Sequence, residues 1–117
     1  MNDTDRVTKA YIESAIADGA PKIASGTYTG DGKSQQFISL GFTPRAVLVL
    51  TKDGLISPGG GYYYGGLAVT DSPVGYNGFN MIRVTDGGFI VCYILTANNG
   101  TFCANAENRV FHYVAFG

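Results

Sequence analysis

Apolar and polar positions follow two different periods along this chain, and the period changes close to residue 20. Residues 1–20 carry apolar side chains near the 3.6-residue spacing of an amphipathic helix, at Val7, Tyr11, Ile12, Ala15 and Ile16. Asp3 or Thr4 is suited to cap the start of this helix, and Gly19 is suited to end it. Because so short a helix is marginal alone in water, we expect it to pack against the domain or against copies of itself.

From residue 21 onward, short apolar runs alternate with turn signals. The chain contains six Asp-Gly or Asn-Gly pairs, which favour the positive φ of tight turns, and most of them lie in this part. The strand-like segments between the turns are residues 23–30, 35–41, 45–52, 66–71, 80–86, 88–96 and 109–116. This pattern predicts an all-β domain over residues 21–117, a small antiparallel β-sandwich of six or seven strands preceded by the short helix.

Three of the predicted strands are apolar on both faces, namely residues 46–50, 89–95 and 110–116. An antiparallel strand with one solvated face alternates apolar and polar side chains, and a sandwich needs only one apolar face per strand. The second face is therefore covered either by loops of the same monomer or by identical copies. We favour a symmetric oligomer that buries the outer face of one sheet, because exposed apolar patches of that size usually mark interfaces.

Composition narrows the class of protein. The 117 residues are enough for one domain, and the net charge of −1 argues against nucleic-acid binding, which needs a basic face. No apolar run approaches the roughly 18 residues of a membrane span, so we expect no membrane insertion. Cys92 and Cys103 form no metal-binding framework, and we expect two unpaired thiols in a reducing compartment.

Residues that would support catalysis are scarce. His112 is the single histidine, and its place among apolar side chains of the last strand favours a packing or interface role. The Gly-Lys-Ser of residues 30–34 lacks the upstream glycine of a phosphate-binding loop and precedes a strand, so it predicts a hairpin turn. Turn formation also explains most aspartates. We therefore expect no enzymatic activity, no catalytic residues, no metal and no cofactor.

Three segments, in order, resemble a family of bacteriophage tail-fibre tip domains. KAYIESAI (residues 9–16) is similar to the helix that precedes such domains. The segments SGTYTGDG and QFISLGFTPRAVLVL, within residues 25–50, are similar to their opening, and FHYVAFG (residues 111–117) is similar to their end. The resemblance implies a virion tail fibre, or a phage-like particle, assembled in the bacterial cytoplasm, with residues 1–20 as the end of a trimeric shaft.

The layout also resembles the H-type lectin domain, a small antiparallel sandwich that forms trimers. The segments Pro44–Val47, Gly88–Phe89 and Tyr113–Ala115 occupy the places of three strand motifs of that family. This chain differs in having no tryptophan. The resemblance implies the architecture and the homotrimer, whereas the sugar-binding residues of those lectins are not carried over.

The densest aromatic patch is GGGYYYGG, residues 59–66. If the strands simply alternate in direction, the loops 30–34 and 53–65 and the turn 86–87 lie at the end opposite residue 20. The loops 41–44, 71–79 and 97–108 then lie at the same end as residue 20. Tyrosines on a glycine-rich backbone are typical of adaptable recognition surfaces, because each ring offers a large contact area at small entropic cost.

We predict a ligand-binding surface around these tyrosines, with a second patch in the segment VGYNGFN. The predicted binding residues are Tyr62, Tyr63, Tyr64, Tyr76, Asn77 and Asn80. One alternative is that the tyrosines fold back and cover the sheet, and another is a split role in which one tyrosine anchors the loop and two are exposed. The favoured function is host attachment by reversible recognition of a bacterial surface polysaccharide or another surface receptor. The competing hypothesis is a structural module that trimerises or caps a fibre, and an enzyme that degrades surface polysaccharide is a third, weaker hypothesis.

Overall fold

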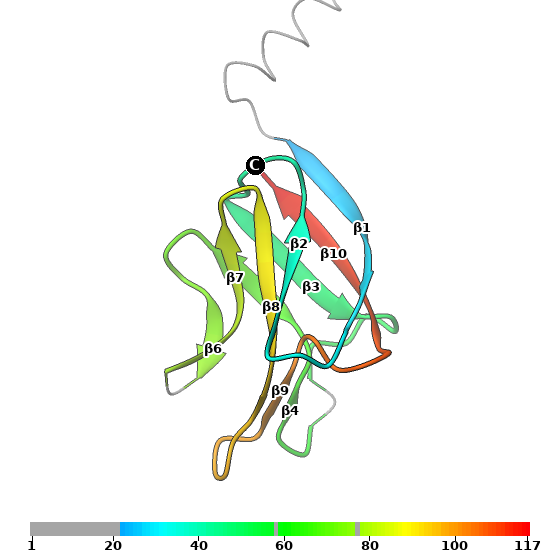
Figure 1. The fold of residues 1–117 in the computed structure, drawn as a ribbon, viewed down its shortest axis with the longest axis vertical. Coiled ribbons are helices and arrows are strands. Elements are labelled where there is room, and N and C mark those ends of the chain that lie inside the picture. Colours follow the sequence, from blue (N-terminus) through cyan, green and yellow to red (C-terminus); the bar gives the residue numbers. More distant parts are fainter. Residues whose placement is uncertain (1–21, 58, 77) are drawn as a thin grey trace, which may run out of the picture.

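The computed structural model describes residues 22–57, 59–76 and 78–117, and this part of the chain is all-β (Figure 1). Its strands are β1 (Ile23–Thr29), β2 (Gln35–Ser39), β3 (Ala46–Thr51), β4 (Tyr62–Tyr63), β5 (Gly66–Val69), β6 (Val74–Tyr76), β7 (Phe79–Thr85), β8 (Gly88–Leu95), β9 (Thr101–Cys103) and β10 (Val110–Phe116). All seven predicted strands are present, with ends within two residues of their predicted bounds. The predicted helix within residues 1–20, and with it the shaft segment, lies outside the described residues.

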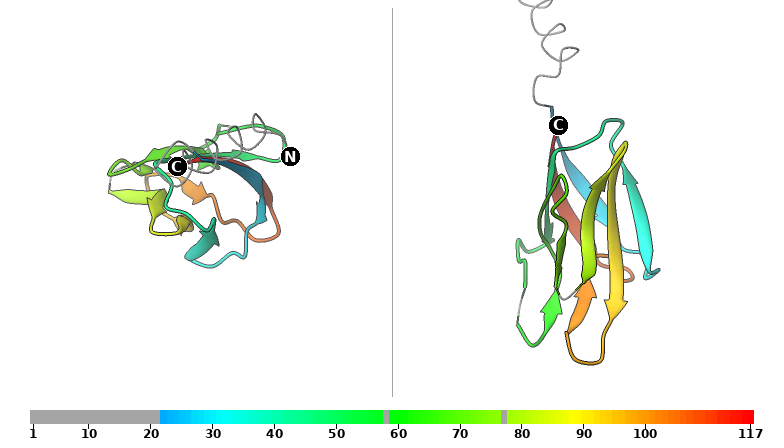
Figure 2. Two further views of the ribbon diagram at one scale, coloured as in Figure 1. Left: turned by 90° about the horizontal axis from the view of Figure 1, so that it is seen from above. Right: turned by 90° about the vertical axis from the view of Figure 1, so that its left-hand side faces the viewer.

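The strands form two sheets that face each other (Figure 2). The first sheet has the order β1-β10-β3-β5 and is antiparallel throughout. The second sheet has the order β4-β9-β8-β7-β6, with β2 paired to β8. Strand β8 pairs with β2 and β7 along its first part and with β9 through its last three residues. The pair β4–β9 is parallel, which differs from the expected antiparallel sandwich.

The core lies between the sheets and is built from large apolar side chains of both. Phe89 and Phe102 from the second sheet and Phe111 from the first are almost completely buried. The ring of Tyr28 stacks on Phe111 with centroids 5.0 Å apart, and its hydroxyl donates a hydrogen bond of 2.5 Å to the carbonyl oxygen of Ala104. Such pairing of a buried hydroxyl removes the cost of its desolvation.

The outer face of the first sheet carries the second set of apolar side chains. The register places His112 beside Thr27 and Leu50, and Val114 beside Leu48. Because paired residues in antiparallel strands point to the same face, these side chains lie together. The apolar members of this face are Ile23, Ala46, Leu48, Leu50, Leu67, Val69, Val110, Val114 and Phe116. Leu67 is 56% exposed, so in the single chain this face meets solvent.

The two ends of the molecule are distinct. The near end is the end at which the described chain begins, and there Lys22 and Gly117 exchange backbone hydrogen bonds of 2.9 and 2.8 Å. The far end is opposite and holds β4, β9 and the β8–β9 turn (Figure 1). Strand alternation predicts correctly that the 53–65 loop lies at the far end, although the loop also contains the short strand β4.

The turn 86–87 and the predicted loop 97–108 each lie at the end opposite to the predicted one. The amide of Gly87 donates to Thr43 Oγ1 at 3.0 Å, which places the turn 86–87 at the near end. The β8–β9 turn and the loop before β10 lie at the far end (Figure 1). The cause is β6, which adds one traverse of the domain within the segment 71–79, where the sequence predicts a loop. Three residues are too few to show a period in the sequence, so the pattern does not reveal this strand.

The buried side-chain amide of Asn105 stabilises the far end through hydrogen bonds. Asn105 is fully buried, and its Nδ2 donates to Asp31 Oδ1 at 2.6 Å and to the carbonyl oxygen of Lys33 at 2.9 Å. Its Oδ1 accepts from Gln36 Nε2 at 2.9 Å and from the amide of Asp31 at 3.2 Å. Hydrogen bonds from the Lys33 amide and from Asn105 hold the pKa of Asp31 below its usual range. The turn 30–34 is thereby joined to the loop that leads into β10.

Asn105→Ala should lower the free energy of unfolding by about 2–3 kcal/mol, because it leaves buried polar partners unpaired. Urea denaturation followed by circular dichroism measures this loss. Asn98→Ala, at an exposed loop position, is the matched control and should change stability by less than about 0.5 kcal/mol. Equal stability of the two variants would contradict a structural role for Asn105.

Candidate binding site

The glycines before the tyrosines form a tight turn. Gly59, Gly60 and Gly61 have φ values of 100°, 68° and 81°, a region that side-chain-bearing residues rarely adopt. This turn leads into β4, where Tyr62 pairs with Thr101 and Tyr63 pairs with Phe102. The amide of Thr101 also donates to the carbonyl oxygen of Gly61 at 2.8 Å. The glycine run therefore fixes the direction of the tyrosines.

The three tyrosines have different surroundings. Tyr62 is 49% exposed. Tyr63 is half-buried and stacks on Phe102, with ring centroids 5.4 Å apart and an interplanar angle of 24°. The ring of Tyr64 lies under the guanidinium of Arg109 at 4.5 Å from the ring centroid. Tyr63 and Tyr64 therefore make internal contacts, as expected of tyrosines that fold back, whereas Tyr62 is exposed.

A cavity of about 170 Å³ lies beside Tyr63. It is lined by Tyr63, Gly65, Val74, Gly75, Tyr76, Met81 and Phe102. Tyr76, which comes from β6 and is 56% exposed, thus meets Tyr63 from β4 at one hollow. Gly65 is required here, because a Cβ atom at this position would collide with the carbonyl oxygen of Val49. The cavity connects the two aromatic patches that the sequence predicts separately.

The other predicted residues have different positions. Asn77 lies outside the described residues, and Asn80 is exposed on β7 without lining the cavity. Phe102, Met81 and Val74 line the cavity but were not predicted as site residues. From the sequence alone, such apolar side chains are expected in the hydrophobic core. The strands β6 and β9 are also too short for the sequence to reveal which face their side chains present. No local signal in the sequence would have separated these residues from the core.

The chemistry of this cavity is aromatic and apolar. No lining residue carries a charge, and the volume is below the ~300–1,000 Å³ of usual small-molecule pockets. The cavity therefore has room for one ring or one small apolar group of a ligand. The tyrosine hydroxyls at its margin are able to donate and accept hydrogen bonds. These properties suit recognition of one unit of a larger molecule.

Other chemistry has little support within residues 22–57, 59–76 and 78–117. This part contains no group of three or more histidine, cysteine or acidic residues that would hold a metal ion, and no helix suited to crossing a membrane. Cys92 and Cys103 are free and buried, and burial raises the pKa of both thiols. A raised pKa keeps them in the less nucleophilic thiol form. His112 lies on the outer face of the first sheet and does not line the cavity.

Comparison with protein families, with curated proteins and with solved structures found no match to this chain. The resemblance to phage tip domains and H-type lectins remains a prediction from the motifs.

Tyr62→Ser should leave the free energy of unfolding within about 0.5 kcal/mol, because the side chain is exposed. Tyr63→Ser should lower it by about 2 kcal/mol, because it removes the stacked ring from Phe102. Urea denaturation of the two variants side by side measures the difference. A large loss for Tyr62→Ser, or none for Tyr63→Ser, would show that the two rings have different environments from those described.

Proposed function

We propose that this chain is the receptor-binding tip domain of a phage or phage-like tail fibre, a β-sandwich that recognises a bacterial surface glycan for host attachment. The observation that carries the proposal is the aromatic cavity at the far end. Residue 22, where the described chain begins, lies at the near end (Figure 1). A shaft before residue 22 would therefore leave Tyr62 and Tyr76 at the end that first meets a host surface.

The chemistry of sugars supports this choice of ligand. A sugar ring has an apolar face of C–H groups that packs on aromatic rings, and hydroxyls around its edge. Tyr62 and Tyr76 offer exposed rings, and Tyr63 with Phe102 offers a stacked aromatic wall. Tyrosine provides both contact area and a hydrogen-bonding hydroxyl at low entropic cost. Binding is reversible in this proposal, and no covalent step is involved.

The outer face of the first sheet supports assembly into a homotrimer. Its apolar side chains on β3, β5 and β10 have no partner within the described chain, and burying them against copies of the same face would remove apolar area from water. Three copies in one tip would also present three glycan sites to one surface. Weak individual sites then give firm attachment, because linked sites bind with a high effective concentration.

The alternative function is a structural module that trimerises or caps a fibre without receptor contact. One observation favours it: Tyr63 and Tyr64 make internal contacts, with Phe102 and with Arg109. Replacing all three tyrosines together would therefore combine a folding defect with a binding defect. The two functions are better separated with the exposed tyrosines alone.

The double variant Tyr62→Ser with Tyr76→Ser should lose at least about tenfold in binding to host cells, while its thermal unfolding stays close to that of the unchanged protein. Flow cytometry of host cells with fluorescent protein measures the binding. Phe37→Ser is the matched control, because Phe37 is an aromatic residue that is 52% exposed on β2, away from the cavity. Unchanged binding by the double variant would favour the structural module.

Light scattering after size exclusion should give a mass three times the 12.4 kDa of the chain. Leu67→Asp should reduce the mass to that of one chain, because it places a charge in the apolar outer face. Phe37→Asp, on the other sheet, should keep the trimer. A monomeric mass for the unchanged protein would contradict the homotrimer.

A further inference from the structure

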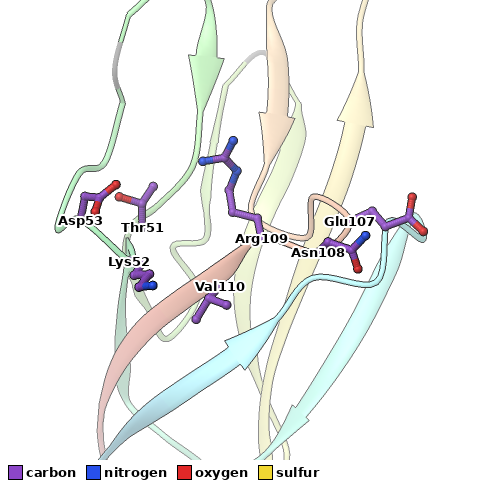
Figure 3. Close-up of a pocket in the computed structure, with 7 residues that line it drawn as sticks. All are labelled: Thr51, Lys52, Asp53, Glu107, Asn108, Arg109 and Val110. Atoms are coloured by element: carbon purple, nitrogen blue, oxygen red, sulfur yellow. The ribbon is translucent and has the colours of Figure 1, made fainter.

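A second hollow lies at the far end, separate from the aromatic cavity. It is a groove of about 370 Å³ between the start of the β3–β4 loop and the loop before β10. The residues that line it are Thr51, Lys52, Asp53, Glu107, Asn108, Arg109 and Val110 (Figure 3). Unlike the cavity, it is mainly polar, and its volume is within the range of ordinary ligand pockets. The recognition proposed for the aromatic cavity makes no use of this groove.

Arg109 is held in place before any ligand arrives. Its amide donates to the carbonyl oxygen of Ala106 at 3.2 Å, and its own carbonyl oxygen accepts from Gly30 at 2.8 Å. Its guanidinium is stacked on the ring of Tyr64, which limits the freedom of a long side chain. A group that is already ordered loses less entropy on binding a ligand.

The charges that line the groove are balanced. Lys52 and Arg109 are basic, and Asp53 and Glu107 are acidic. Figure 3 shows Arg109 extending toward the side of Thr51 and Asp53, and Glu107 extending away from them. Within the described residues, no ion pair joins Arg109 to either carboxylate. Arg109 supplies only donors and Asp53 supplies only acceptors, so both kinds of hydrogen-bonding group face the groove unpaired with each other.

We propose that this groove binds an uncharged sugar ring through neighbouring hydroxyl groups. A hydroxyl is able to accept a hydrogen bond from Arg109 and to donate one to Asp53, which a carboxylate or phosphate cannot do. Because the two basic and two acidic side chains balance, the groove has no net charge that would favour an anionic or a cationic ligand. This inference rests on the proposed function, since it assigns a second subsite to the same glycan and states that the unit bound there is neutral.

The tyrosine segment links the two subsites. Tyr63 lines the cavity, and the next residue, Tyr64, supports Arg109 in the groove. Two adjacent residues of one short segment therefore contribute to both hollows.

The test is a nuclear magnetic resonance titration of the ¹⁵N-labelled full chain with methyl glycosides of glucose, galactose and mannose, up to about 100 mM. A site with a Kd of about 10 mM is mostly filled at that concentration. At least one glycoside should shift the amide signals of Asp53, Asn108 and Arg109. Cyclohexanol, which has a ring but a single hydroxyl, and glucuronate, which carries a carboxylate, are the comparison probes and should bind at least about tenfold more weakly.

Two variants and a control complete the experiment. Arg109→Gln and Asp53→Asn should each weaken glycoside binding at least about tenfold, because each removes a charged hydrogen-bonding partner. Arg45→Gln removes an exposed arginine near the opposite end and should bind as the unchanged protein does. The absence of shifts at the groove with every glycoside would overturn the inference. So would glucuronate binding that depends on Arg109 and improves in Asp53→Asn, which would indicate an anion site.

The outcome is distinguishable from failure of the proposed function. If no glycoside shifts the amide signals of the groove while the double variant of Tyr62 and Tyr76 still loses host-cell binding, the receptor function is supported and the second subsite is wrong. If a glycoside binds the groove but the intact protein does not bind host cells, the sugar subsite stands and the host-attachment function is wrong.

Discussion

The far end of this protein depends on one buried amide. Asn105 hydrogen-bonds with Asp31, Lys33 and Gln36, and so joins the turn 30–34 to the loop that precedes the last strand. This turn connects β1 of the first sheet to β2 of the second, so it is not the hairpin turn that the sequence predicts. That loop also carries Arg109, whereas β9, just before Asn105, carries Phe102. Both hollows at the far end therefore use elements whose position follows from this network. A buried amide with all its partners is specific in geometry, because any shift leaves a polar group unpaired.

The glycines of residues 59–61 and the tyrosines that follow them have complementary structural roles. The sequence suggests a flexible loop that adapts to its target, whereas the structure has a glycine turn of defined geometry followed by a two-residue strand. Positive φ at successive glycines reverses the chain within a few residues, and the parallel pairing with β9 then fixes Tyr62 and Tyr63. Recognition by rings on such a backbone would be pre-organised, which reduces the entropy lost on binding.

The two sheets divide the surface into regions of different character. The outer face of the first sheet is mainly apolar, and His112 lies on it between Leu50 and Thr27 of the neighbouring strands. The far end is hollowed and mixes aromatic with charged groups. In the proposed tip domain, the first region would serve assembly and the second would serve recognition. Separate regions allow the binding end to change its side chains without disturbing the contacts between copies.

The sequence by itself determined the all-β class, the seven longer strands and the presence of apolar side chains on both faces of β3 and β10. These features follow from local periodicity and turn residues, which act over a few neighbouring positions. It did not reveal β4, β6 and β9, because strands of two or three residues have no period and exist only through pairing with strands already in place.

Only the tertiary structure decided which residues form the candidate site. The extra traverse by β6 carried Tyr76 to the far end beside Tyr63, and parallel pairing of β4 with β9 placed Phe102 between them and the core. Arg109 and Asp53 are far apart in the sequence and meet at one groove because their loops lie at the same end. Such contacts are non-local, so no window of the sequence contains both partners, and only the folded chain brings them together.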